Sequence, residues 1–474
     1  MKISLKQANI FLSALQALTA LGYGFRILSE AGTDFGIYYL GGVSANRDFE
    51  LYGDFFEHKG PTYYAFIKLL AYLISYGVFG SCITLAVTAM VWFICINGAL
   101  SVAKIQNTST IVLVKLLSVS VLFAQSSNSS IFLFGSGLSI LGITTLMDFT
   151  LRPRFKTLLM SSVLISLAAL TKLDSLAILL PCFILTLRIK KKRFQFFTTF
   201  WGCFIVVTGT LILAFSLFLP YKLKDAFYAA IEFVLTVRWN SENISATDLV
   251  FQRNLYTFLP LATSGIIFAI ILIYISNLNS RIAPTSLVLF SSYGLIIFLI
   301  LGSSKSYHLF DFYTFAIIGL LFQAQLLDGI PKKLRFALIG YLLAVSFTIN
   351  FGYSQETKCL LDDHKCQTRF SILLTEDKVF SKSDYFLSQG WPYIILEKLP
   401  AINPNVYWPL AVETGRSSTN LVEAIRTSKK IMWFDSNDLN FIRENNPMLY
   451  ESLFSRMKVI DVVNDGQWIA YKNY

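Results

Sequence analysis

The chain has 474 residues, and its composition excludes soluble, disordered and fibrous proteins. Hydrophobic residues make up 54% of the chain and charged residues only 15%, against roughly 25% in a soluble domain. The 42 Phe and 23 Tyr also suit lipid and its interfaces. We therefore predict a polytopic α-helical membrane protein. The net charge of +11 does not indicate a nucleic-acid partner, because the basic residues concentrate in short loops between apolar segments.

Apolar segments of about 20 residues predict membrane-spanning helices, and we count about eleven of them. The fifth and sixth are short and form one tight hairpin. The first follows a basic stretch, as in a secretory signal, but it lacks a small-residue cleavage site and is predicted to be retained. The predicted spans cover residues 8–27, 79–102, 109–126, 130–149, 157–171, 173–188, 196–219, 255–277, 284–302, 307–327 and 334–351.

Lys and Arg concentrate in alternate connections between the spans, which assigns those connections to the cytoplasm. The N-terminus is then cytoplasmic, and an odd number of spans places the C-terminus outside. Residues 1–351 form the predicted transmembrane domain, with long outer loops at 28–78 and 220–254. Residues 352–474 form a polar outer tail, which is long enough to hold a small α/β core of its own. Its β-like runs are 429–434 and 467–471, and residues 448–457 are predicted to be helical.

Two of the six cysteines, Cys359 and Cys366, lie at the start of the outer tail. In an oxidising compartment they would form a disulfide. Metal binding by this pair with His364 is the alternative. The other four cysteines lie in predicted spans, where they are expected to act as small buried hydrophobic residues.

The first outer loop carries many charged residues close to the membrane surface. Charged residues in such a position usually indicate a function. A partly desolvated carboxylate here would act as a general base on an acceptor hydroxyl. A lysine and an arginine would bind an anionic phosphate. A solvated polar loop is the alternative. The titratable residues considered are Asp34, Arg47, Asp54, Glu57, His58 and Lys59.

The spacing of these residues resembles a known family. Asp34 is followed four residues later by Tyr38, and the loop ends in the sequence YGDFFEHKGP at residues 52–61. This pattern resembles the first outer loop of family-39-like glycosyltransferases, the integral-membrane GT-C enzymes that include protein O-mannosyltransferases and the lipid A aminoarabinose transferase. The resemblance implies a long first outer loop, eleven or more spans and an outer C-terminal α/β domain.

The resemblance also implies roles for individual residues. Asp34 would be the catalytic base, and Lys59 would contact the donor phosphate. Asp54 would position the acceptor or the sugar, while His58 would line the site or serve packing alone. Gly60 and Pro61 would end the loop and start a helix.

One turn departs from the family pattern. Relatives often carry an acid between the third and fourth spans, but residues 125–130 (QSSNSS) hold no charge. Asp174 and Lys172, at the tip of the next hairpin, are the candidate substitutes. The alternative is a turn whose charges snorkel to the interface.

Further outer residues could complete an anion site for a lipid phosphate. Arg238 lies in the second long loop, and Lys305 and His308 lie at the turn before the tenth span. Pairing of the cations with lipid headgroups is the alternative.

These observations predict an inverting transfer of a hexosyl or pentosyl group from a polyprenyl-phosphate donor to an acceptor hydroxyl. The acceptor would be a glycolipid, lipid A, a polysaccharide or a protein, at the outer face of a bacterial inner membrane. A divalent metal is compatible with this chemistry, but nothing in the sequence requires one. The alternatives are a polysaccharide polymerase or ligase and a lipid-linked sugar transporter or flippase. No phosphate-binding glycine loop or dinucleotide fingerprint appears, which argues against a nucleotide-fuelled enzyme.

Overall fold

The structure is a computed structural model whose described residues divide into two compact units. One unit includes Met1–Phe25 and Leu85–Ile212, and the other includes Arg26–Thr84 and the strands of the C-terminal tail. The four predicted spans from residue 255 onward lie outside the described residues, apart from residue 317. Described are residues 5–28, 33–44, 51–52, 59–73, 77–105, 108–123, 129–172, 178–187, 193–219, 221–226, 317, 385–387, 432–435, 439–440, 443–444, 447–455, 457–463 and 468–473.

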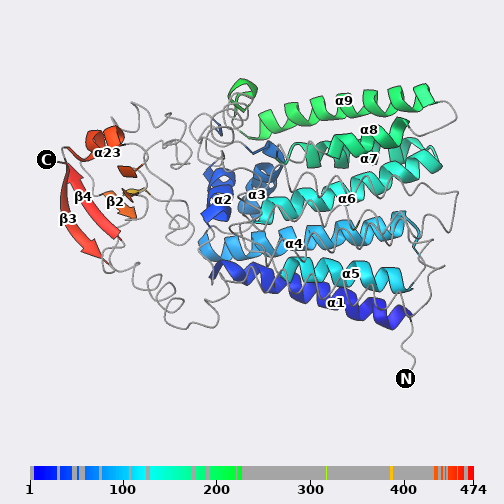
Figure 1. The fold of residues 1–474 in the computed structure, drawn as a ribbon, viewed down its shortest axis with the longest axis horizontal. Coiled ribbons are helices and arrows are strands. Elements are labelled where there is room, and N and C mark those ends of the chain that lie inside the picture. Colours follow the sequence, from blue (N-terminus) through cyan, green and yellow to red (C-terminus); the bar gives the residue numbers. More distant parts are fainter. Residues whose placement is uncertain are drawn as a thin grey trace, which may run out of the picture. The chain divides into compact units, whose positions relative to one another are not determined.

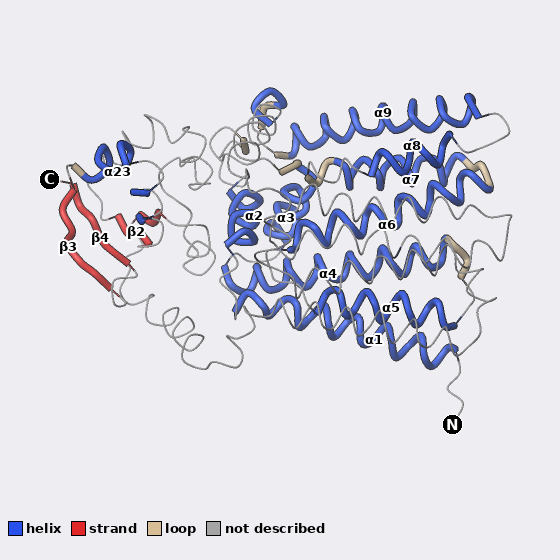
Figure 2. Tube along the Cα trace, in the orientation of Figure 1, coloured by secondary structure: helices blue, strands red, loops and turns tan. Residues whose placement is uncertain are grey.

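The described N-terminal half is helical, and a helix occupies each of its seven predicted spans (Figures 1 and 2). Three helices there are long and apolar enough to cross a membrane, namely α4, α6 and α9. The helices are α1 (Leu5–Gly24), α2 (Thr33–Ser44), α3 (Pro61–Leu73), α4 (Gly77–Val102), α5 (Thr108–Phe123), α6 (Ser130–Leu151), α7 (Phe155–Ala169), α8 (Leu179–Leu187) and α9 (Arg193–Phe218), with a 3-10 turn at Phe25–Leu28.

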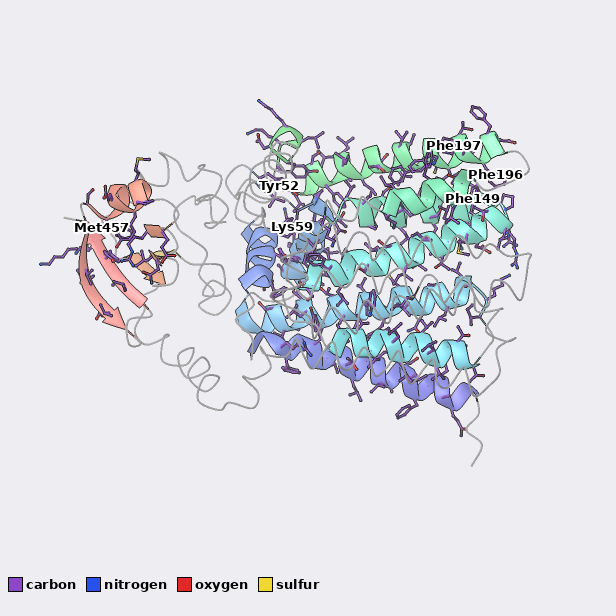
Figure 3. All side chains as sticks on the ribbon, viewed as in Figure 1. Tyr52, Lys59, Phe149, Phe196, Phe197 and Met457 are labelled. Atoms are coloured by element: carbon purple, nitrogen blue, oxygen red, sulfur yellow. The ribbon has the colours of Figure 1, made fainter. Side chains whose placement is uncertain are left out.

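Helix α6 is the inner helix of the first unit, since 94% of its apolar window is buried, against 11% for α9. Glycines let its neighbours approach closely. A Cβ at Gly137 would lie 3.2 Å from the Cα of Trp92 on α4, and one at Gly142 would lie 2.9 Å from the Ile165 side chain on α7. At one end of the helix, the ring of Phe149 packs against Phe196 of α9, with centroids 5.4 Å apart (Figure 3).

A polar seam joins α1, α4 and α5. The Lys115 Nζ donates to the Asn9 Oδ1 at 2.5 Å and to the Ser13 Oγ at 2.9 Å. One turn further on, the Gln16 Nε2 donates to the Ser118 Oγ at 3.2 Å. The seam reaches α4 through Asn97, whose Nδ2 donates to the Gln16 Oε1 at 3.0 Å. Polar side chains that bond across helices in this way fix the register of the helices.

The contacts also give relative helix directions. Lys115 meets Asn9 while Ser118 meets Gln16, so α1 and α5 run parallel. On α4 and α6, Gly98 contacts Leu141 while Gly137 contacts Trp92, so these two helices are also parallel. The first and third spans therefore share one direction, as do the second and fourth, which agrees with alternating connections. The compartment on each side stays a prediction.

The second unit contains two helices within the predicted outer loop 28–78. Helix α3 begins at Pro61, as the Gly60–Pro61 pair predicts, because proline at the first helical position sacrifices no hydrogen bond. Helix α2 was not predicted, and this part of the loop is therefore ordered as a helix rather than as a polar coil. At Gly42 of α2 a Cβ would collide with the Ile67 side chain of α3, so the glycine permits the close packing of the two helices.

The tail contains a four-stranded sheet in the order β1-β2-β4-β3, shown in orange and red in Figure 1. Strand β1 pairs parallel to β2, and the other pairs are antiparallel, with an irregularity between Val459 and Asp461. Phe454 of α23 packs on Tyr471 with ring centroids 4.7 Å apart. Strands β2 and β4 overlap the two runs predicted to be β, and each extends past the C-terminal end of its run. The domain boundary at 351/352 stays a prediction. The elements are β1 (Tyr385–Leu387), β2 (Met432–Asp435), α23 (Pro447–Phe454), β3 (Met457–Val463) and β4 (Trp468–Asn473).

Candidate functional site

The candidate site begins with helix α2, which carries the first half of the motif. Asp34 is the second residue of α2, and Tyr38 follows one turn later. Residues four apart share a face of a helix, so the backbone places Asp34 on the same face as Tyr38. The side chain of Asp34 lies outside the described part of the chain, and its role as base stays a prediction.

Lys59, the motif lysine, is buried beside this face of α2. Its side chain is 9% exposed, and its Nζ lies 4.8 Å from the ring centroid of Tyr38. The negative face of an aromatic ring attracts an ammonium group, and the attraction strengthens when both are desolvated. Tyr38 is in turn fixed by an edge-to-face contact with Tyr63 of α3, with centroids 6.0 Å apart. The aromatic pair therefore holds the ammonium in a defined position.

Tyr52 connects the start of the second half of the motif to Lys59, near its end. Its hydroxyl donates to the backbone carbonyl of Lys59 at 2.6 Å, and both residues are labelled in Figure 3. The backbone of Tyr52 has φ 70°, a left-handed conformation that is costly for a bulky residue. The ring of Tyr52 packs edge-on against Tyr221, with centroids 5.5 Å apart. These contacts fix the two residues between which Asp54, Glu57 and His58 lie in the sequence.

Tyr221, whose ring packs against Tyr52, is uncharged. Burial raises the pKa of Tyr221 to about 12, above the ordinary value near 10. Its hydroxyl therefore stays protonated throughout the physiological range. The ring acts on Tyr52 through packing rather than through charge.

The start of α3 adds partial positive charge next to Lys59. The first N–H groups of a helix have no partner within it, and the helix dipole makes this end positive. The Thr62 Oγ1, in the first turn of α3, is buried and has no hydrogen-bond partner in the described structure. Together with the Lys59 ammonium, these groups suit an anion such as a phosphate.

Lys172 is the second candidate lysine that the structure describes. It follows the C-terminus of α7, is only 4% exposed, and places its Nζ 3.5 Å from the ring centroid of Phe132 on α6. A lysine that snorkels to the interface keeps its ammonium in water, so this burial argues against the alternative interpretation. The role of Lys172 in phosphate binding stays a prediction.

The remaining predicted site residues fall outside the described residues, and their roles stay predictions. In the part of the chain that is described, no group of three or more metal-type ligands occurs. The residues concerned are Arg47, Asp54, Glu57, His58, Asp174, Arg238, Lys305, His308, Cys359 and Cys366.

The sequence interpretation missed two features. Lys115 lies in the middle of a predicted span, where a lysine is rare enough to be a signal of function or of a specific partner. The second feature is the hydrogen bond from the Tyr52 hydroxyl to the Lys59 carbonyl. No sequence pattern predicts it, because nothing in the sequence indicates which backbone group a tyrosine hydroxyl will bind.

Comparison with solved structures identifies the fold. ArnT from Cupriavidus metallidurans, a GT-C glycosyltransferase, matches over 98% of both chains in a crystal structure bound to undecaprenyl phosphate, with a TM-score of 0.53 and 14% identity. The apo crystal structure of the same protein matches over 98% of both chains, with a TM-score of 0.54 and 13% identity. The GT-C fold implied by the motif is therefore confirmed.

No protein-family profile matches the sequence. No curated protein matches it either.

Proposed function

We propose that this chain is a membrane glycosyltransferase that transfers a sugar from a polyprenyl-phosphate donor to an acceptor hydroxyl. The observation that carries the proposal is the buried Lys59, whose ammonium lies over the ring of Tyr38 and whose backbone carbonyl accepts a hydrogen bond from Tyr52. The fold supports it, because the ArnT structure with the same fold holds undecaprenyl phosphate. An ammonium fixed in this way stabilises the negative charge of a phosphate before and after it leaves.

In the proposed reaction Asp34 is the general base. It accepts the proton of the acceptor hydroxyl while that oxygen attacks the anomeric carbon of the sugar. The bond from the anomeric carbon to the phosphate oxygen breaks on the opposite side, and its electron pair leaves with the polyprenyl phosphate. The configuration inverts because a single displacement occurs. Asp54 positions the acceptor or the sugar.

Lys59 holds the departing phosphate, assisted by one or more of Lys172, Arg238 and Lys305. The reaction takes place at the outer face of a bacterial inner membrane. The N-terminus lies in the cytoplasm, and residues 352–474 form an extracytoplasmic α/β domain. The transferred group is a hexosyl or a pentosyl unit.

A transfer assay in membrane vesicles tests the base. The vesicles come from cells that carry or lack the gene, and the readout is movement of labelled sugar from the polyprenyl lipid to an acceptor. Asp34→Asn preserves size and hydrogen bonding but removes the proton acceptor, so the transfer rate should fall about 10²–10⁴-fold. Affinity for undecaprenyl phosphate should persist.

Thr33→Ala is the matched control, because Thr33 is the neighbouring residue of α2 and carries no proton-accepting carboxylate. This variant should retain most of the activity. If Asp34→Asn transfers sugar at the wild-type rate, Asp34 is not the base. If cells with and without the gene show the same labelled products, the transferase proposal itself is wrong.

A further inference from the structure

Lys115 is a charged residue that the proposed reaction does not use. It is the eighth residue of α5, and only 4% of its surface is exposed. Helices α5 and α1 lie side by side (Figure 1), and the lysine reaches across from one to the other. A lysine inside a bundle of apolar helices is rare and usually indicates a function or a specific partner.

The helices around Lys115 supply no counter-ion. Its Nζ donates to the Asn9 Oδ1 and to the Ser13 Oγ, and both of these acceptors are neutral. The sequences of α1, α4 and α5, the helices of the polar seam, contain no Asp or Glu. A buried charge is costly unless an opposite charge accompanies it. An anion from outside these three helices would therefore stabilise the ammonium.

The same three side chains offer the hydrogen-bond donors that such an anion needs. A lysine has three N–H donors, and the bonds to Asn9 and Ser13 use two of them. The amide nitrogen of Asn9 carries two more donors, and the Ser13 hydroxyl donates as well as accepts. Because both side chains contact the same ammonium, these donors lie close together. Such a group suits a phosphate, which has several acceptor oxygens.

The site is open on the side of α1. Asn9 and Ser13 are exposed, although the lysine behind them is buried. Ile10 and Phe11, their neighbours on α1, are apolar and also exposed. Apolar side chains on the surface of a membrane helix suit lipid chains, which are equally apolar. An anionic group that reaches Asn9 along this surface is therefore expected to be part of a lipid.

The site also lies at the depth of lipid headgroups. Asn9 is the fifth residue of α1, which places it about 6 Å from the first residue of the helix. The two headgroup layers together add roughly 10–15 Å to the hydrocarbon core, so one layer has a similar depth. Helices α1 and α5 run parallel and begin at the same end, where the exposed Lys104 precedes α5. A further cation at this level attracts anionic lipid.

We propose that Lys115, Asn9 and Ser13 bind the phosphate of an anionic phospholipid, in the leaflet that faces the N-terminal end of α1. The phosphate supplies the negative charge that α1, α4 and α5 lack, and the acyl chains lie along the apolar surface of α1. Binding at this site requires only that the chain spans a membrane, and it does not depend on the proposed function.

Equilibrium binding of lipids to the purified full-length protein in detergent tests the site. The probes are phosphatidylglycerol, diacylglycerol with the same acyl chains but no phosphate, and undecaprenyl phosphate. We expect the wild type to bind phosphatidylglycerol about tenfold or more tightly than diacylglycerol, because the bonds involve charged groups. Lys115→Gln should lose most of this preference. Lys156→Gln, at an exposed lysine of α7, is the matched control and should retain it.

Asn9→Asp tests the site without removal of the lysine. The substitution preserves the size of the side chain and places a carboxylate beside the Lys115 ammonium, where it replaces the lipid phosphate as counter-ion and repels it. The preference for phosphatidylglycerol should disappear, while the unfolding temperature in lipid-free detergent stays at or above the wild-type value. Gln195→Glu is the matched control, because it adds the same charge at an exposed amide of α9. This variant should bind phosphatidylglycerol as the wild type does.

Three results would overturn the inference. The first is equal wild-type affinity for phosphatidylglycerol and diacylglycerol. The second is affinity for phosphatidylglycerol within twofold of wild type in both Asn9→Asp and Lys115→Gln. The third is a loss of undecaprenyl phosphate binding in Asn9→Asp as large as the loss of phosphatidylglycerol binding, which would assign the site to the polyprenyl lipid. Failure of the proposed function has a different result, namely equal wild-type affinity for undecaprenyl phosphate and undecaprenol.

Discussion

Removal of one hydroxyl group tests how the motif positions Lys59. In Tyr52→Phe the ring remains against Tyr221, but the 2.6 Å hydrogen bond to the Lys59 carbonyl is lost. A neutral hydrogen bond contributes about 1 kcal/mol net, and a buried carbonyl left without its partner costs about 1–3 kcal/mol. The left-handed backbone at Tyr52 stores a further ~1–3 kcal/mol that the bond helps to hold in place.

From these contributions we expect the arrangement of Tyr52 and Lys59 seen in the structure to lose about 1–2 kcal/mol of stability in Tyr52→Phe. Since about 1.4 kcal/mol corresponds to a tenfold change in affinity, binding of undecaprenyl phosphate should weaken about five- to thirtyfold. The measurement is equilibrium binding in detergent, with the unfolding temperature recorded alongside it. Tyr72→Phe is the control, because Tyr72 on α3 is 81% exposed. Binding within twofold of wild type in Tyr52→Phe would refute the role of this bond.

Three further predictions concern packing and ionisation. Gly42→Ala should destabilise the protein by about 1–3 kcal/mol in thermal unfolding, because the added methyl group overpacks α2 on α3. Gly209→Ala is the control and should be tolerated, because nothing lies within 4 Å of its added Cβ. Lys115→Met should cost about 1–3 kcal/mol because it removes two hydrogen bonds from a charged donor to α1, whereas the same change at the exposed Lys104 should have little effect. The pKa of Tyr221 is about 12 in the fold and near 10 unfolded, so its contribution to stability is complete below pH 10 and disappears between pH 10 and 12. Tyr221→Phe should therefore flatten the loss of stability over that range, and an unchanged alkaline slope would contradict the burial argument.

The hydrophobic pattern predicts the positions of seven helices in the described N-terminal half, because a backbone in lipid must satisfy its own hydrogen bonds and apolar helices do so. It does not predict α2. Gly41 and Gly42 lower the helix propensity of that segment, and its helical form depends on packing against Ile67 of α3. Similarly, the partners of Lys115 lie more than 100 residues earlier in the chain, and no local pattern reveals them.

The motif makes Lys59 the candidate lysine of the site, but it does not predict which residues contact the Lys59 side chain. The contact between Lys59 and Tyr38 joins α2 to the residues just before α3, across an intervening stretch of the sequence, so only the folded chain shows it. The left-handed residue is a second example. Glycine adopts such a backbone at the lowest cost, so Gly53 would be the expected position, yet Tyr52 has φ 70°. Its ring packing and its hydrogen bond compensate for that cost.

The most direct test of the central claim is the affinity of the purified protein for undecaprenyl phosphate relative to undecaprenol, in wild type and in Lys59→Met. The two lipids differ only in the phosphate, and hydrogen bonds to charged groups contribute about 1.5–3 kcal/mol. We expect the wild type to prefer the phosphate by about tenfold or more, and Lys59→Met to lose most of that preference. Equal affinity for the two lipids in the wild type, or an unchanged preference in Lys59→Met, would contradict the account.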